Sequence, residues 1–178
     1  MKKIFLAVIC AVMAVSFSGC FSTGGASPNG SVQTSEAPDS KSIKADDYDD
    51  NLDGLEKYFI ALGYIPKDSE PTQMLYSVIG ATDGDRYYFS VNNSSVYVEL
   101  YQYNPNNLDD KAQRVINEVK KDGKFYVFDN SVAGGNTPYE ATLSDNGKYL
   151  MIYTDKSEVK ENVQRKADVI NALKAFHK

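Results

Sequence analysis

Apolar residues recur at helical spacing in three stretches of the chain, and each stretch predicts an amphipathic helix. The first helix is predicted over residues 52–62, with Gly63 placed to end it in the left-handed conformation. The second is predicted over residues 108–121, because aspartates occupy its first turn and lysines its last. The third is predicted from about Ser157 to the end of the chain. Its apolar stripe consists of Val159, Val163, Ala167, Ile170 and Leu173.

Short runs rich in β-branched and aromatic residues lie between these helices and predict strands. Three of them, residues 74–80, 86–91 and 95–103, are separated by Asp-Gly and Asn-Asn pairs that are typical of hairpin turns. Residues 124–129 predict a further strand, and residues 139–155 predict a second hairpin. The order helix, three strands, helix, three strands, helix predicts an α+β fold. We expect a two-layer sandwich with a mainly antiparallel sheet of five or six strands.

Residues 95–103 alternate in a way that separates two faces of the predicted strand. Val96, Val98 and Leu100 point to one side, which we expect to lie against the helices. The other side, called here the tyrosine face, is then exposed to solvent. With one residue from the neighbouring strand it consists of Tyr88, Tyr97, Glu99, Tyr101 and Tyr103.

The tyrosine face is the candidate binding site, in a chain that has 13 tyrosines and no tryptophan. Exposed tyrosines are rigid and amphipathic, which suits contacts with a glycan or with another protein. The alternative is that aromatic residues are simply good cross-strand neighbours on a half-exposed sheet.

The chain divides into three parts by composition. Residues 1–19 begin with two lysines and continue as an apolar run, which predicts an export signal that is removed. Residues 20–50 are rich in Ser, Gly, Pro, Thr and Asp and bury too little apolar surface to fold, so we expect a flexible tether. Residues 51–178 are predicted to form a single domain.

The segment Phe17-Ser18-Gly19-Cys20 at the end of the export signal resembles the lipobox of bacterial lipoproteins. In that family the cysteine thiol carries a diacylglyceryl group, and cleavage makes the cysteine the first residue. The resemblance covers only the first twenty residues. It implies lipidation at Cys20, attachment to the membrane through that anchor, and a place on the extracytoplasmic face of the bacterial cell membrane. The alternative is an ordinary secretory signal that happens to contain a cysteine.

Composition disfavours several kinds of chemistry. Cys10 leaves with the signal and Cys20 is consumed by the lipid, so no thiol is left for a disulfide, a metal or a nucleophile. The single histidine, His177, is second from the end, where we expect fraying and no catalytic role. Loss of Lys2 and Lys3 changes the net charge from −5 to −7, which disfavours nucleic acid as a partner. We expect no cofactor.

An acidic cluster before the first helix raises the question of calcium. Asp49, Asn51, Asp53 and Gly54 match the first half of an EF-hand loop. Ile60, however, occupies the position where a bidentate carboxylate closes such a site. Capping of the first helix by Asp53 is therefore favoured, with calcium as the alternative.

These observations predict a lipid-anchored, extracytoplasmic binding or accessory module that is not an enzyme and engages a protein or cell-wall partner. One alternative is an enzyme that acts on a cell-wall polysaccharide with two carboxylates, Asp83 with Asp85 or Glu99 with Glu140. Another is a receptor domain for a small molecule or calcium.

Overall fold

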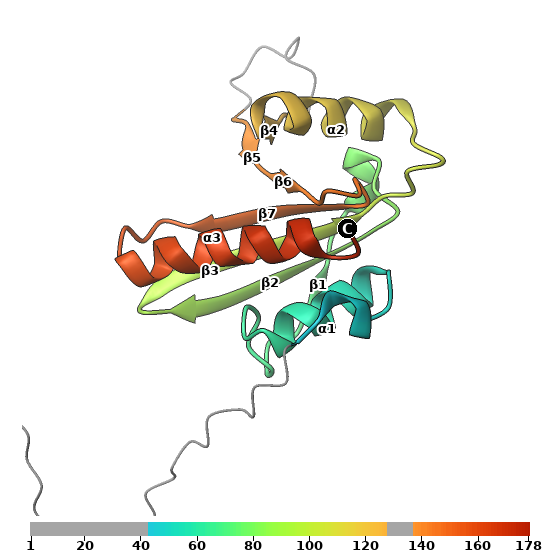
Figure 1. The fold of residues 1–178 in the computed structure, drawn as a ribbon. Helices are drawn as coiled ribbons and strands as arrows, with labels where there is room; N and C mark the ends of the chain where they lie inside the picture. Colours follow the sequence, from blue (N-terminus) through green and yellow to red (C-terminus); the bar gives the residue numbers. More distant parts are fainter. Residues whose placement is uncertain (1–42, 128–136) are drawn as a thin grey trace, which may run out of the picture. The chain divides into compact units, whose positions relative to one another are not determined.

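The computed structural model describes residues 43–127 and 137–178 and confirms an α+β fold (Figure 1). Three α-helices accompany a five-stranded sheet and a small two-stranded sheet, and all strand pairs in both are antiparallel. The predicted export signal, Cys20 and most of the predicted tether lie outside the described residues. Within the described ranges, no helix is both long enough and apolar enough to span a bilayer.

The main sheet has the strand order β1-β2-β3-β7-β6. Its strands are β1 Thr72–Gln73, β2 Asp83–Val91, β3 Ser94–Gln102, β7 Tyr149–Asp155 and β6 Thr142–Leu143. The β2–β3 hairpin pairs all nine residues of each strand, and Asn92 and Asn93 form its turn with φ values of 48° and 62°. The predicted Asn-Asn turn is therefore confirmed, and it fixes the register of the longest pair of strands.

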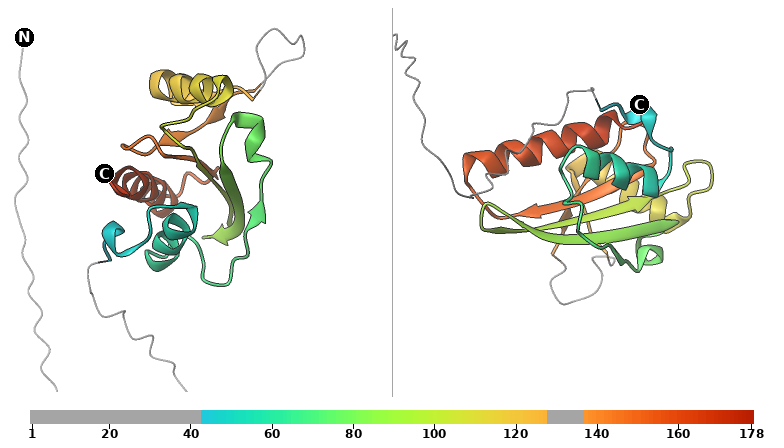
Figure 2. Two further views of the ribbon diagram at one scale, coloured as in Figure 1. Left: turned by 90° about the vertical axis from the view of Figure 1, so that its right-hand side faces the viewer. Right: turned by 90° about the horizontal axis from the view of Figure 1, so that it is seen from below.

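One face of the main sheet, called here the inner face, is covered by helices α1 Leu52–Ala61 and α3 Lys160–Ala175 (Figure 2). Val96, Val98 and Leu100 of β3 point into this core, as the alternation predicted. The helices contribute Leu55, Phe59, Val169, Leu173 and other apolar side chains.

The outer face of the sheet is covered at one end only. The connection from β3 to β7 carries α2 Asp110–Asp122 and the small sheet of β4 Lys124–Phe125 and β5 Tyr139–Glu140 to this end. A second core forms there and buries Tyr101 and Tyr103, which are 6% and 0% exposed. The prediction that both tyrosines face solvent is therefore wrong, because the sequence gives no sign of where the long connection packs.

The segment 74–80, predicted as a strand, is instead occupied mainly by the 3-10 helix η2 Tyr76–Ile79. Gly80 ends η2 with a φ of 73° and lies against the first turn of α2. A Cβ at this position would lie 2.5 Å from the backbone nitrogen of Ala112. The close approach of η2 and α2 therefore requires glycine.

Helix α3 begins at Lys160, and only the C-terminal part of the predicted stripe, Ile170 and Leu173, packs against the core. Val159 and Val163 are exposed, whereas the buried residues of the C-terminal segment are Asn162, Val169, Ala172, Leu173 and Phe176. Asn162 donates hydrogen bonds to Asp155 Oδ2 at 2.7 Å and to the Val91 carbonyl at 3.3 Å. A polar residue at a core-facing position interrupts the apolar period, which is why the pattern misplaced the buried face in the N-terminal half of the helix.

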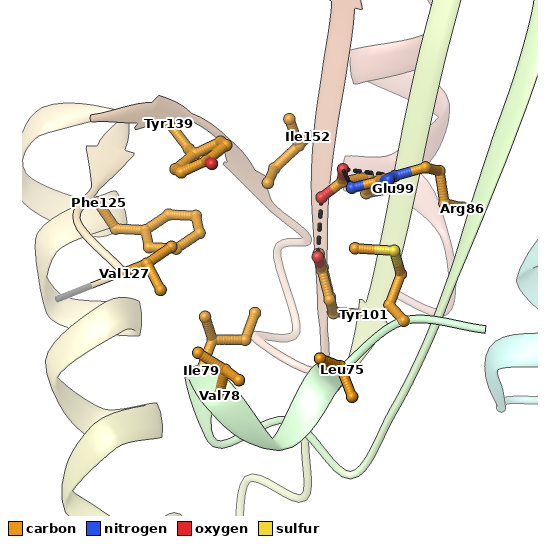
Figure 3. A pocket seen from close by; sticks show the side chains of 11 residues that line it. Leu75, Val78, Ile79, Arg86, Glu99, Tyr101, Phe125, Val127, Tyr139 and Ile152 are labelled. Carbon is orange, nitrogen blue, oxygen red and sulfur yellow. Dashed lines mark hydrogen bonds and ion pairs between the residues drawn. The ribbon is translucent and has the colours of Figure 1, made fainter. Parts of the chain in front are cut away.

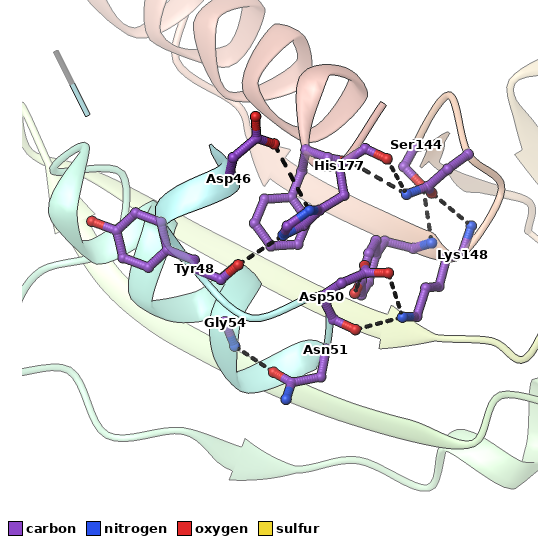
Figure 4. Close-up of polar contacts among 11 residues, drawn as sticks. Asp46, Tyr48, Asp50, Asn51, Gly54, Ser144, Lys148 and His177 are labelled. Atoms are coloured by element: carbon purple, nitrogen blue, oxygen red, sulfur yellow. Dashed lines mark hydrogen bonds and ion pairs between the residues drawn. The ribbon is translucent and has the colours of Figure 1, made fainter. Parts of the chain in front are cut away.

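Residues 45–50, predicted as the end of the tether, are bound to the domain (Figure 4). Asp50 accepts a hydrogen bond from the Tyr149 hydroxyl at 2.7 Å, and its carboxylate lies 2.9 Å from Lys148 Nζ. Nε2 of His177 donates to the Tyr48 carbonyl at 2.9 Å, so His177 is not at a frayed end. The described residues 43–127 and 137–178 belong to one compact unit that contains both cores.

Candidate functional site

Two exposed tyrosines lie side by side on the uncovered end of the outer face. Tyr88 of β2 is directly opposite Tyr97 of β3, and their ring centroids are 4.6 Å apart. The residues are 57% and 42% exposed. The two rings are tilted by 34° to each other, and this tyrosine pair is exposed to solvent, as predicted for these two residues.

An ion pair lies next to the tyrosine pair on the same face, two residues away along each strand. Arg86 is opposite Glu99 and donates to Glu99 Oε1 from Nε at 2.8 Å and from Nη2 at 2.6 Å. The Tyr101 hydroxyl donates to the other oxygen, Oε2, at 2.8 Å. Burial and the adjacent Glu99 charge raise the pKa of Tyr101, so its hydroxyl stays protonated and continues to donate. The buried Glu99 carboxylate is thus held from both sides.

A pocket of about 170 Å³ adjoins this ion pair at the border between the uncovered and covered ends of the outer face (Figure 3). Its other lining residues are apolar or aromatic. They come from the segment from β1 to η2, from the main sheet, and from the small sheet together with Val127 shortly after β4. These residues are Met74, Leu75, Val78, Ile79, Tyr101, Ile152, Phe125, Val127 and Tyr139. Leu75 is 80% exposed beside the pocket, so an apolar side chain stands open to solvent there.

We call the tyrosine pair, the Arg86–Glu99 ion pair and this pocket together the outer-face site. Of the five residues predicted for the tyrosine face, Tyr88, Tyr97, Glu99 and Tyr101 belong to it, although Tyr101 is buried. Tyr101 lines the pocket, and Tyr103 lies in the core, where its hydroxyl donates to the Ile79 carbonyl at 3.3 Å.

Sequence reasoning missed Arg86 and the apolar pocket. Arg86 carried a usable signal, because a two-residue turn at Asn92-Asn93 places it opposite Glu99 on the same face. No sequence signal indicated the pocket. Its lining residues Leu75 and Tyr139 are 64 positions apart in the sequence, and the connection between β3 and β7 brings Tyr139 to the pocket.

The calcium candidates have other roles in the structure. Asn51, and not Asp53, caps α1, because its side chain accepts a hydrogen bond from the Gly54 nitrogen at 2.8 Å. Asp53 pairs instead with Lys57 at 2.6 Å on the surface. A Cβ at Gly54 would lie 1.9 Å from the Asp49 carbonyl oxygen, so the glycine is explained by this close approach. No group of three or more His, Cys, Asp or Glu residues suited to a metal ion occurs within 43–127 and 137–178.

The candidate catalytic carboxylates Glu99 and Glu140 have different partners, whereas burial, followed by the charge of Asp83, raises the pKa of Asp85. Glu99 is held by Arg86 and Tyr101, while Glu140 Oε2 lies 3.6 Å from Lys166 Nζ. Asp83 accepts a hydrogen bond from the Gly84 nitrogen at 2.9 Å.

Two carboxyl groups that the sequence did not pair, Glu56 of α1 and Asp85 of β2, lie together on the inner face. Burial, followed by the charge of Asp85, raises the pKa of Glu56 from 4.5 to about 7. Glu56 Oε1 has no hydrogen-bond partner among the described residues. Neither carboxyl lines the outer-face pocket, so this pair bears on stability and not on the candidate site.

Comparison of the chain with protein-family models, with curated proteins and with solved structures gives no match.

Proposed function

We propose that the protein is a lipid-anchored, extracytoplasmic binding module, not an enzyme, and that its outer-face site engages a protein partner. The observation that carries this proposal is the clustering of exposed apolar and aromatic side chains around one ion pair. Within the described ranges, eight large hydrophobic residues are exposed. Five of them lie at or beside this site: Leu75, Val78, Tyr88, Tyr97 and Tyr139.

The composition of the outer-face site favours a protein over a glycan. Tyrosine, methionine and arginine are enriched in the cores of protein interfaces, and all three occur here. Interface energy is concentrated where a large side chain fills a pocket, and this site combines a pocket with an exposed pair of aromatic side chains beside it. The pocket walls are mainly apolar, and their polar side-chain groups are those of Arg86 and Glu99 and the hydroxyls of Tyr101 and Tyr139, whereas a sugar ring would need polar partners all around it.

Binding is favoured over catalysis by the state of the acidic groups. The Glu99 carboxylate accepts three hydrogen bonds, and Glu140 is paired with a lysine. A general acid or base must exchange a proton with substrate, which these contacts oppose.

The membrane attachment in this proposal depends on the lipobox resemblance at residues 17–20. Two acyl chains on Cys20 provide stable anchoring where one chain does not. A flexible tether of about 25 residues, from Cys20 to the bound segment 45–50, has a root-mean-square span of about 25 to 30 Å, which would allow the domain to reach a partner away from the lipid surface.

Site-specific photo-crosslinking of the full chain in its native host tests the partner. A photoreactive phenylalanine analogue replaces Tyr97, or as a matched control replaces Val163, which is exposed on α3. We expect an adduct of defined mass from position 97 that is absent from position 163. The purified wild-type domain should compete this adduct away, and the Tyr88→Ser, Tyr97→Ser double variant should not. The same adduct from both positions, or none from position 97, contradicts the proposal.

Metabolic labelling with a fatty acid tests the anchor. The full chain should incorporate the label and remain with the membrane fraction, and Cys20→Ser should abolish both. Labelling that persists in Cys20→Ser contradicts lipidation at this residue.

A further inference from the structure

We infer that the outer-face pocket binds one leucine-sized or phenylalanine-sized side chain of a partner polypeptide, while Arg86 donates hydrogen bonds to the carbonyl or carboxylate of that same residue. The inference rests on the proposed function and adds the chemistry by which the partner is recognised.

The size of the pocket sets the size of the occupant. The pocket has a volume of about 170 Å³, and apolar cavities of about 150 Å³ in proteins bind benzene. The space therefore accommodates one large apolar side chain and excludes a fused ring system or a long acyl chain. Its walls are mainly aliphatic and aromatic carbon, so the occupant gains most from being apolar itself.

The polar edge of the pocket offers hydrogen-bond donors and few acceptors. Both Glu99 oxygens are occupied, since Oε1 accepts twice from Arg86 and Oε2 accepts from Tyr101. A guanidinium has five N–H groups, and Arg86 spends two of them on Glu99. The other three have no partner among the described residues, and the Arg86 side chain is 42% exposed. An occupant that presents an oxygen acceptor at this edge therefore meets the unpaired donors of Arg86.

An amino-acid residue in a polypeptide satisfies both requirements at once. Its side chain is apolar, and its own carbonyl oxygen lies only a few bonds away from that side chain. A C-terminal residue would present a carboxylate, which the positive charge of Arg86 also favours. The fixed position of Arg86, held by Glu99 on the neighbouring strand, means that little entropy is lost when the acceptor binds.

NMR titration of ¹⁵N-labelled residues 39–178, the compact unit with both cores, tests the inference. The probes are N-acetylleucine, its N′-methylamide, which mimics an internal residue, and N-acetylalanine, which lacks the anchor. We expect the two leucine compounds to shift the amide signals of Leu75, Val78 and Phe125 with millimolar affinity. N-acetylalanine should bind at least about tenfold more weakly, because it lacks three buried carbons.

Variants separate the apolar pocket from its polar edge. Val78→Trp fills the pocket and should abolish the shifts, while Val163→Trp on α3 is the matched control and should not. Leu75→Ala removes an exposed wall and is a second pocket variant if Val78→Trp does not fold. The Arg86→Gln, Glu99→Gln double variant removes the ion pair without leaving a lone charge and should weaken N-acetylleucine about tenfold.

Equal shifts with N-acetylleucine and N-acetylalanine, or binding unchanged in both pocket variants, would overturn the inference. If the leucine compounds do not bind but Tyr97 still gives its specific adduct, the proposed function stands and this pocket is not its anchor point. If they bind but Tyr97 gives no adduct, the pocket is real and the proposed protein partner is wrong.

Discussion

Replacing Glu56 by glutamine should stabilise the domain above neutral pH and have less benefit in acid. The Glu56 carboxyl is buried beside Asp85, and burial with that neighbouring charge raises its pKa from 4.5 to about 7. As pH rises, the unfolded chain therefore loses this proton first. Unfolding becomes easier between about pH 4.5 and pH 7, and this loss of stability is complete above pH 7.

The size of the effect follows from the shift. One pKa unit corresponds to about 1.4 kcal/mol, so the shift of Glu56 corresponds to about 3 kcal/mol as an upper value. Part of this is shared with Asp85, whose own pKa is raised by burial. Glutamine keeps the shape of the side chain but cannot ionise. The quantity to compare is the stability difference, the free energy of unfolding of Glu56→Gln minus that of the wild type. This difference should be about 2 to 3 kcal/mol larger at about pH 8 than at about pH 4.

Urea denaturation followed by circular dichroism at both pH values measures this difference. Comparison within the same variant cancels any effect of the amide that does not depend on pH. Glu161→Gln on the exposed surface of α3 controls for the loss of one glutamate, and Asp85→Asn should reduce the pH dependence by removing the neighbouring charge. A difference for Glu56→Gln that is the same at both pH values refutes the reasoning.

Three further substitutions test other contacts. Tyr101→Phe should cost about 1 to 3 kcal/mol in urea denaturation, because Glu99 Oε2 loses its donor in a buried site; no loss would contradict this. Gly54→Ala should lower the free energy of unfolding by about 2 kcal/mol or more, since its Cβ would overlap the Asp49 carbonyl; an unchanged thermal midpoint would contradict it. Burial alone would raise the pKa of Asp50, but hydrogen bonds and nearby positive charge hold it below 3.8, so its contribution to stability is lost in acid. Asp50→Asn should therefore be less stable than the wild type at neutral pH, with a difference that shrinks as pH falls, and a constant difference would refute this.

Local signals in the sequence predicted the parts of the fold that depend on neighbouring residues. Gly123 ends α2 in the left-handed conformation with a φ of 66°, close to the predicted boundary. The Asn92-Asn93 turn fixed the register of β2 and β3, and with it the pairing of Tyr88 and Tyr97. The inner face of β3 followed from simple alternation.

The errors arose where distant segments decide what is buried. Tyr101 and Tyr97 have the same alternation and similar composition around them, but only Tyr101 lies under the connection between β3 and β7. The buried face of α3 was misjudged in its N-terminal half, because Asn162 is buried there through hydrogen bonds to the ends of β2 and β7, which an apolar period cannot reveal. Residues 76–79 form a 3-10 helix although the composition of the segment 74–80 favours a strand, since short apolar runs do not distinguish the two.

The contacts of residues 45–50 have a mechanical consequence if the chain is anchored through its N-terminal side. Tension on that side enters the domain at the η1 segment Ala45–Asp47 and meets the Tyr48–His177 hydrogen bond before it meets the Asp50–Lys148 ion pair. These contacts are few and arranged in series, so they would be pulled apart one after another by peeling. The β2–β3 hairpin that carries the tyrosine pair would bear load only after they had separated. Residues 45–50 would therefore detach first under force, and the geometry of the outer-face site would be preserved while they do.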